Sequence, residues 1–267
     1  MKRAVMRRSP VLLLAVLVTL LASVGAGRAE PAEADYRRLN EALVERHVVP
    51  GYARLAKATA GLGTSADTFC AAPSMPALEG LRDAYGAAAD AWQGIQHVRF
   101  GPVELFMRSV RFAFWPDPRN TVGRQLTSTL AARDPEAVAQ SAFDRGSIAV
   151  QGLPALERLL FGENSAEALL ASSDDARYRC TMVVAVSHNL AVIAADVETA
   201  WTEGPGAFAT VIAAAGPDND RYRDPKEATL DLFKSLYTAV ELVADHKLAK
   251  PLGASLAAAR PNLAESW

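Results

Sequence analysis

The sequence is poor in the residues from which most metal and nucleophilic sites are built. It has 2 cysteines and 4 histidines among 267 residues. A structural zinc cluster uses about four such ligands grouped closely in the chain, so this cysteine count excludes a thiolate cluster. Also absent are His-Glu-x-x-His, Gly-x-Ser-x-Gly, a Walker loop and Gly-x-Gly-x-x-Gly. The chain therefore does not carry the sequence of an ordinary zinc peptidase, serine hydrolase or nucleotide-binding enzyme.

Alternating apolar and polar runs long enough for β-strands are also missing, which favours an all-α fold. Apolar residues instead recur every three or four positions, and the clearest stripe is Val183, Val186, Leu190, Ile193 and Val197. We expect helices over residues 35–62, 76–98, 119–132, 134–151, 156–161, 176–202 and 225–248, with Gly and Pro between them. Pro50 predicts a bend in the first helix, because proline removes a helical hydrogen bond.

Residues 1–29 are expected to be a secretory signal peptide. Lys2, Arg3, Arg7 and Arg8 precede an apolar run over residues 11–22 that is too short to span a bilayer. The mature protein is thus expected in the periplasm and not across the membrane. An uncleaved leader, which would keep the protein associated with the membrane, is the alternative.

The charge balance argues against nucleic acid as a partner. The whole chain has 28 basic and 30 acidic residues. The expected signal peptide holds five of the basic residues and no acidic residue, so the mature balance is 23 basic to 30 acidic. An acidic chain lacks the positive surface that nucleic-acid backbones require.

Cys70 and Cys180 form an even pair in a chain that is expected to be exported. This predicts a disulfide between two distant helices. In the chain-entropy account, closing a loop of this size contributes about 4–5 kcal/mol. The alternative, a thiolate metal site, needs more Cys or His partners than the chain shows.

Four stretches of the sequence resemble one known family. They are HVVPGYARLAKAT from His47, WQGIQHVRFGPVE from Trp92, FWPDPRN from Phe114 and VQGLPALERLLFG from Val150. Together they resemble the bacterial imelysin family, whose hallmark is Gly-x-His-x-x-Glu at the start of an apolar helix. Here the hallmark positions hold Gly152, Pro154 and Glu157, so a proline stands where the family has histidine. Proline offers no side-chain donor and no ligand atom.

The resemblance implies two successive four-helix-bundle units with the hallmark near their interface. On that pattern residues 30–162 form the first unit and residues 163–267 the second. The stretch from Pro261 to Trp267 resembles the start of a segment that continues for several more helices in the family. The second unit is therefore expected to be incomplete at its C-terminal end, with a partial chain favoured over a naturally short variant. An open bundle would expose an apolar face that invites aggregation or a partner.

The family motif also predicts where a metal would bind. Its His and Glu are three residues apart, which places both on one helix face. With Pro154 in place of histidine, Glu157 needs other partners, since tight transition-metal sites use three or more ligands. Asp90 and His97 share one face of the helix over residues 76–98, and Glu104 follows the break after it. We therefore predict a metal site made of Glu157, His97, Glu104 and Asp90.

Structural roles are the alternatives for these and the other histidines. Glu157 can pair with an arginine or cap the backbone near Pro154. His47 precedes the predicted bend, where a free helix carbonyl can accept its proton. His188 lies on the apolar helix in a core or interface position, and His246 lies near a helix end, where the dipole favours a cation.

The resemblance implies a role in bacterial iron acquisition at the cell envelope. We predict a binding or accessory protein of iron uptake, non-catalytic because Pro154 removes the histidine that would organise a metal-activated water. The expected cofactor is iron or another divalent metal, and the expected partner is that ion or an envelope iron-uptake protein. Two alternatives stay open: an imelysin-type metallopeptidase, and a periplasmic scaffold that binds a partner protein.

Overall fold

The computed structural model describes residues 30–259; the predicted signal peptide and the stretch from Pro261 to Trp267 lie outside the described residues. Every regular element within residues 30–259 is helical, so the all-α fold class is confirmed. The α-helices are α2 (Glu33–Leu43), α3 (Val49–Ala71), α4 (Met75–Ile95), α5 (Arg108–Phe112), α6 (Thr121–Ala132), α7 (Gln140–Phe143), α8 (Leu153–Phe161), α9 (Ser165–Leu170), α10 (Asp174–Thr202), α11 (Phe208–Ala213), α12 (Pro225–Leu242) and α13 (Lys250–Leu252). Two π-helical segments, Val44–Val48 and Val243–Ala249, extend α2 and α12. Short 3₁₀ turns lie at Gly101–Val103, Leu105–Met107, Glu136–Val138, Ile148–Val150 and Leu256–Ala258.

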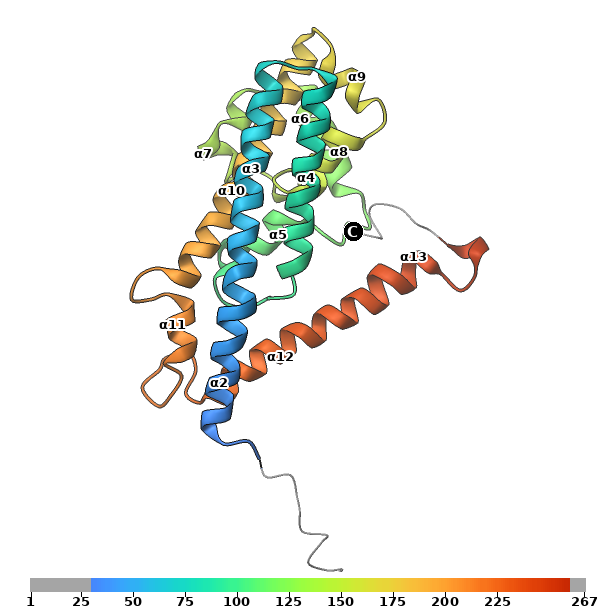
Figure 1. Cartoon of the computed structure of the whole chain (residues 1–267). Coiled ribbons are helices and arrows are strands. Elements are labelled where there is room, and N and C mark those ends of the chain that lie inside the picture. The colour runs from blue at the N-terminus through green and yellow to red at the C-terminus, as the bar shows by residue number, and fades with distance from the viewer. Residues whose placement is uncertain (1–29, 260–267) are drawn as a thin grey trace, which may run out of the picture.

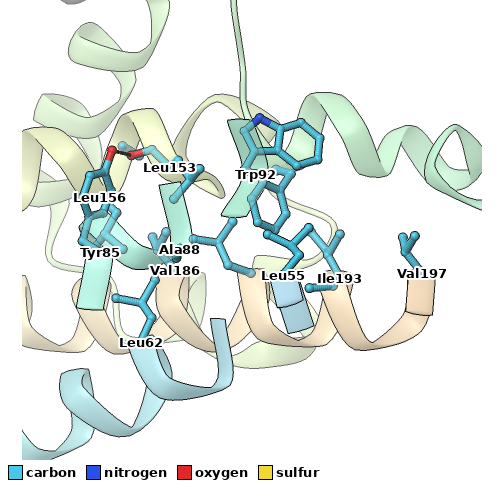
Figure 2. Packing of buried hydrophobic residues seen from close by; sticks show 14 of the residues in the cluster. Leu55, Leu62, Tyr85, Ala88, Trp92, Leu153, Leu156, Val186, Ile193 and Val197 are labelled. Carbon is cyan, nitrogen blue, oxygen red and sulfur yellow. Dashed lines mark hydrogen bonds between the residues drawn. The ribbon is translucent and has the colours of Figure 1, made fainter. Parts of the chain in front are cut away.

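Three long helices, α3, α4 and α10, form the centre of the fold (Figure 1). α10 packs along α3, and α3 packs along α4. Leu55 and Leu62 of α3 meet Val186 and Ile193 of α10 in the buried layer that Figure 2 shows. The predicted apolar stripe on α10 is confirmed, because none of its five side chains is more than 4% exposed. Burying a side chain of this size contributes about 1.5–3 kcal/mol, so the five side chains of this stripe contribute strongly to the stability of the bundle.

α8 closes the bundle on the side of α4. Two guanidinium nitrogens of Arg82 donate to the Leu160 carbonyl oxygen at 3.0 and 2.8 Å, which ties α4 to the C-terminal end of α8. At the other end of α8, the Tyr85 hydroxyl donates to the Leu153 carbonyl oxygen at 3.4 Å, as the dashed line in Figure 2 shows. These two contacts fix the position of α8 on the bundle.

The N-terminal end of α12 is anchored to α2. The buried amide of Asn40 on α2 donates to the Pro225 carbonyl oxygen at 2.8 Å and accepts from the Thr229 hydroxyl at 2.7 Å. From there α12 runs obliquely away from α3 (Figure 1). Four of its large apolar side chains are more than half exposed: Phe233, Leu236, Tyr237 and Val240. We call these four residues the α12 apolar face.

The division of the chain at residue 162 stays a prediction. α10 belongs to the predicted second unit, yet it packs on α3 and α8 of the first. The buried side chains of both segments join in one hydrophobic cluster. α12, in contrast, lies mostly outside that cluster (Figure 1).

Two local expectations differ from the structure. The helix predicted over residues 134–151 is broken into α7 and two 3₁₀ turns, because Ala139 and Ser147 are extended and the Ser147 hydroxyl accepts from the Ala149 amide. Serine competes in this way for backbone donors and interrupts helices. Near Pro50 the chain forms the π-helical turn Val44–Val48. Pro50 has no amide hydrogen to donate, so one hydrogen bond of the helix is missing there. The chain accommodates this with a wider, π-helical turn.

One helix within residues 30–259, α10, is long and apolar enough to cross a membrane by length and composition. Half of its most apolar window is buried inside the fold. Core helices and membrane spans share this composition, and here α10 packs against α3 and α8.

The predicted disulfide is present. Cys70 at the end of α3 and Cys180 on α10 are bonded with a Cα–Cα distance of 5.5 Å, across 110 residues of sequence. The bond therefore links the two helices whose packing forms the central seam.

Replacing both cysteines by serine is expected to lower the free energy of unfolding by up to about 4–5 kcal/mol, because the unfolded chain regains the entropy of a long loop. Urea denaturation followed by circular dichroism measures this difference. The wild-type protein, measured once without and once with reductant, serves as the matched comparison. Equal midpoints for all three samples would contradict the expectation.

Candidate functional site

The residues at the hallmark positions form the start of α8. Gly152 precedes the helix, and a Cβ atom there would lie 2.4 Å from the Phe112 carbonyl oxygen and 2.5 Å from that of Arg111. No side chain fits at such a distance, so glycine permits α8 to approach the end of α5. Pro154 is the second residue of α8. Proline suits the first turn of a helix, whose amide groups have no partner within the helix.

Glu157 lies beside Tyr85 of α4. Burial raises the pKa of the Tyr85 hydroxyl, and the Glu157 carboxylate raises it further. His97 lies 12 residues beyond Tyr85, which is about 18 Å along a helix. Glu157 and His97 are therefore at different levels of the bundle.

The other two predicted ligands also lie apart. Asp90 is exposed on α4. Glu104 is exposed. Its charge acts on Arg221: the pKa of that guanidinium is raised mainly by a hydrogen bond with Tyr222, and Glu104 makes the smallest contribution. Within residues 30–259 no three His, Cys, Asp or Glu side chains are grouped so that they could hold a metal ion. The structure thus does not bring Glu157, His97, Glu104 and Asp90 together, and their shared role as ligands stays a prediction.

A buried polar network that the sequence did not reveal lies behind the motif. Arg111 donates to the Gln151 side-chain oxygen at 2.8 Å and to that of Asn189 at 3.2 Å. The Asn189 amide donates to the Gln151 carbonyl oxygen at 2.8 Å, which joins α10 to the residue before Gly152. Gln151 and Asn189 are at most 1% exposed. Each polar atom named here has a partner, so the network positions α5, α8 and α10 relative to one another.

The structure pairs His97 with His47. Their Nε2 atoms are 2.8 Å apart, and their ring centroids are 4.8 Å apart. His47 comes from the π-helical turn Val44–Val48, and His97 is the second residue after the end of α4. A π-helical turn adds a residue to a helix and is frequent at functional sites, because it redirects a side chain. Within residues 30–259 this pair is the one arrangement in which two histidines meet.

An apolar groove of about 470 Å³ lies beside the histidine pair, where α2, the end of α4 and α12 meet. Besides the histidines its wall includes Leu39, Leu43, Val48, Phe100, Phe233 and Leu236. We call this the apolar groove. The Ser235 hydroxyl of α12 accepts from the Arg99 amide at 3.0 Å and holds α12 over the segment that carries His97.

A smaller hollow of about 90 Å³, also lined by His97, lies between the end of α4 and the end of α12. Its lining joins four polar residues of the α4 end and the second π-helical segment to a mostly apolar stretch of α12, and we call it the cationic hollow: Gln93, Gln96, Arg99, Lys247, Thr238, Ala239, Leu242 and Val243. Lys247 comes from the second π-helical segment. Sequence reasoning missed Arg99 and Lys247, since only the fold brings these two residues to one place.

The remaining two histidines contact other side chains. His188 of α10 contacts both carboxylate oxygens of Asp67 on α3 at 3.0 Å. His246 lies 2.9 Å from the Lys250 amine at its Nδ1 atom. Neither residue lines the apolar groove or the cationic hollow.

Solved structures share this fold. An imelysin-like protein from Psychrobacter arcticum matches with a TM-score of 0.70 and 23% identity, over 84% of this chain and 65% of its own. A putative iron-regulated protein A precursor from Parabacteroides distasonis matches with a TM-score of 0.67 and 18% identity, over 85% of this chain and 63% of its own. The chain is thus an imelysin-like helical-bundle protein by its fold.

The sequence comparisons give the family. The family model for imelysin, a peptidase family, matches residues 48–267, so the chain belongs to the imelysin family. Iron-regulated protein A from Synechococcus elongatus is 25% identical over 214 residues, which are 79% of this chain and 54% of that protein. The chain therefore spans about half the length of this curated relative. The resemblance read from the four sequence stretches is confirmed.

Gly152→Ala is expected to lower the free energy of unfolding by about 1–3 kcal/mol, because the added methyl group would meet two backbone carbonyl oxygens. Gly86→Ala on α4 is the control: a Cβ there meets nothing within 4 Å, and alanine favours the helix by about 1 kcal/mol. Chemical denaturation of both variants measures the two shifts. Equal stabilities would contradict the close approach of α8 to α5.

His97 is expected to titrate below the ordinary histidine value of 6.5, because burial lowers its pKa first and the charge of His47 lowers it further. Below pH 6.5 the unfolded chain then binds more protons at this residue than the folded protein, so acid destabilises the fold. His47→Gln removes the second cause alone and should raise the pKa of His97 in part. NMR titration of the imidazole signals measures this, and an unchanged His97 pKa in the variant would show that the two rings do not interact.

Proposed function

We propose that this protein is a non-catalytic binding protein of iron uptake at the cell envelope, and that the His47–His97 pair is the group that faces the iron. The observation that carries the proposal is the 2.8 Å approach of the two Nε2 atoms in the wall of an open groove. Imidazole nitrogen is a common protein ligand of iron. The relative named iron-regulated protein A supports the connection with iron.

The motif residues support a non-catalytic role. A metal-dependent peptidase needs about three protein ligands and a group that activates water. In this chain Gly152 and Pro154 serve the start of α8, and Glu157 lies beside Tyr85. The donor set of the described residues therefore does not fit a closed metal site, and we derive no hydrolytic step from it.

Two observations support location at the envelope. The first is the predicted signal peptide over residues 1–29, with its basic start and short apolar run. The second is that the Parabacteroides distasonis relative is described as a precursor. A disulfide between Cys70 and Cys180 is in keeping with an oxidising compartment.

A scaffold that binds a partner protein is the second candidate function. The α12 apolar face favours it, because contiguous exposed apolar residues of this size mark interaction surfaces. Such a role predicts a partner whose binding does not change when metal is removed. It would also leave the His47–His97 pair without effect on binding.

His97→Ala and His47→Ala are each expected to weaken Fe²⁺ binding at least tenfold, since each removes one of the two imidazole donors. Anaerobic calorimetry of the purified chain measures the affinity, and elemental analysis measures the metal content. The matched control is His188→Ala, which removes a histidine that binds Asp67 far from the groove. Circular dichroism establishes that the three variants are folded.

Other outcomes point to other functions. Equal Fe²⁺ affinity in the wild type, His47→Ala and His97→Ala would overturn the proposed site. A loss of Fe²⁺ affinity that occurs only in Glu157→Ala would place the iron site at α8 instead. Digestion of casein by the same metal-loaded sample, abolished by chelation, would instead establish the peptidase.

A further inference from the structure

α12 carries a stripe of apolar side chains on the side that is turned away from the bundle (Figure 1). Its members are 50%, 58%, 70% and 61% exposed: Leu230, Phe233, Tyr237 and Val240. We call these four residues the outer stripe. Ser235 marks the bundle side of α12, since it is buried and bonded to the segment after α4. At about 100° per residue, each member of the outer stripe lies about 140–160° from Ser235 around the helix axis.

The spacing of the outer stripe is that of a helix that pairs with another helix. Its members follow one another at intervals of three, four and three residues, which are the a and d positions of a heptad. A helix that packs only on its own bundle needs one apolar side, not a second one opposite. Contiguous exposed apolar side chains mark an interaction surface. The outer stripe therefore fits the apolar seam of a second helix.

The charges beside the outer stripe are complementary to each other. Lys234 and Glu241 each follow a d position, so both occupy e positions. Both are exposed, and the ion pairs within residues 30–259 include neither of them. The g positions hold Thr229, Leu236 and Val243, which carry no charge. One edge of α12 thus supplies both halves of an ion pair.

These charges distinguish the ways in which two α12 helices can pair. In a parallel pair e positions face g positions, so both charges would meet uncharged residues. In an antiparallel pair e positions face each other. With Tyr237 beside Val240 of the second copy, Lys234 of each copy then lies opposite Glu241 of the other. Sliding the helices until Tyr237 lies beside Phe233 would instead place Lys234 opposite Lys234, and like charges disfavour that register.

We propose that the outer stripe binds a second copy of this chain, with the two α12 helices antiparallel. Two-fold symmetry brings the same patch of both copies together, and a stripe with its own complementary charges satisfies this condition. A single helix pair buries less than the roughly 800 Å² per partner of a standard interface, so we expect a dimer that dissociates on dilution. The contact contains no metal, so a chelator should leave the dimer unchanged.

Analytical ultracentrifugation of the purified chain over a range of concentrations tests the proposal. We expect an equilibrium between monomer and dimer. Tyr237→Glu should weaken the dimer at least about tenfold, because it places two carboxylates in the apolar seam. Val192→Glu is the matched control: Val192 is a 49% exposed apolar residue of α10, outside the stripe, and its replacement should have no effect. Circular dichroism establishes that both variants are folded.

An exchange of charges tests the antiparallel register. Lys234→Glu and Glu241→Lys each place like charges opposite each other twice, so each should weaken the dimer at least about tenfold. Mixed together, the two variants should form a heterodimer, because one copy then presents two carboxylates to two amines of the other. An affinity tag on one variant measures this by capture of the other. Lys57→Glu, an exposed lysine of α3, is the control for net charge and should leave the dimer intact.

Four outcomes would overturn the proposal. The first is a chain that stays monomeric at every concentration. The second is a dimer that Tyr237→Glu and both charge variants leave intact, since it would use another surface. The third is a monomer that dimerises only after removal of residues 260–267, which would show that the end of the chain occupies the stripe. Failure of the two charge variants to associate with each other would exclude the antiparallel pair.

Discussion

The seam between α3 and α10 is the constraint on which the rest of the structure depends. α10 contributes a continuous buried stripe, and α3 and α8 both pack against it. The Cys70–Cys180 bond fixes one end of this seam. Because α4 packs on α3 and α8 packs on α4, the position of each of these helices follows from the seam. The same helix contacts set the distance between His47 and His97, since His47 precedes α3 and His97 follows α4.

Sequence reasoning predicted the parts of the fold that depend on local pattern. The spacing of Val183, Val186 and Leu190 identified the buried side of α10, because helical periodicity decides burial directly. At Pro50 a bend was expected, and the structure instead has a π-helical turn next to it. The prediction of one helix over residues 134–151 was wrong. The Ser147 hydroxyl accepts a hydrogen bond from the Ala149 amide and interrupts the helix, and the spacing of apolar residues does not reveal such a contact.

The candidate site was predicted less well, for a physical reason. The metal ligands were sought near Glu157 by analogy with the family motif, but Glu157 and His97 are separated along the length of α4. His97 was singled out, whereas its partner His47 was considered only beside a free backbone carbonyl. Their meeting depends on how α2, α3 and α4 pack, and so do the positions of Arg99 and Lys247. No spacing within one helix contains that information.

The π-helical turn at Val44–Val48 sets the rotation of α2 about its axis. A π-helical turn holds one residue more than an α-helical turn, and one residue corresponds to about 100° of rotation. Loss of a single residue here would turn α2 by that angle relative to α3. Leu39 and Leu43 would leave the groove wall, and Asn40 would leave its contacts with α12. Deletion of one codon in this turn is therefore enough to remodel the groove while the α3–α10 seam stays as it is.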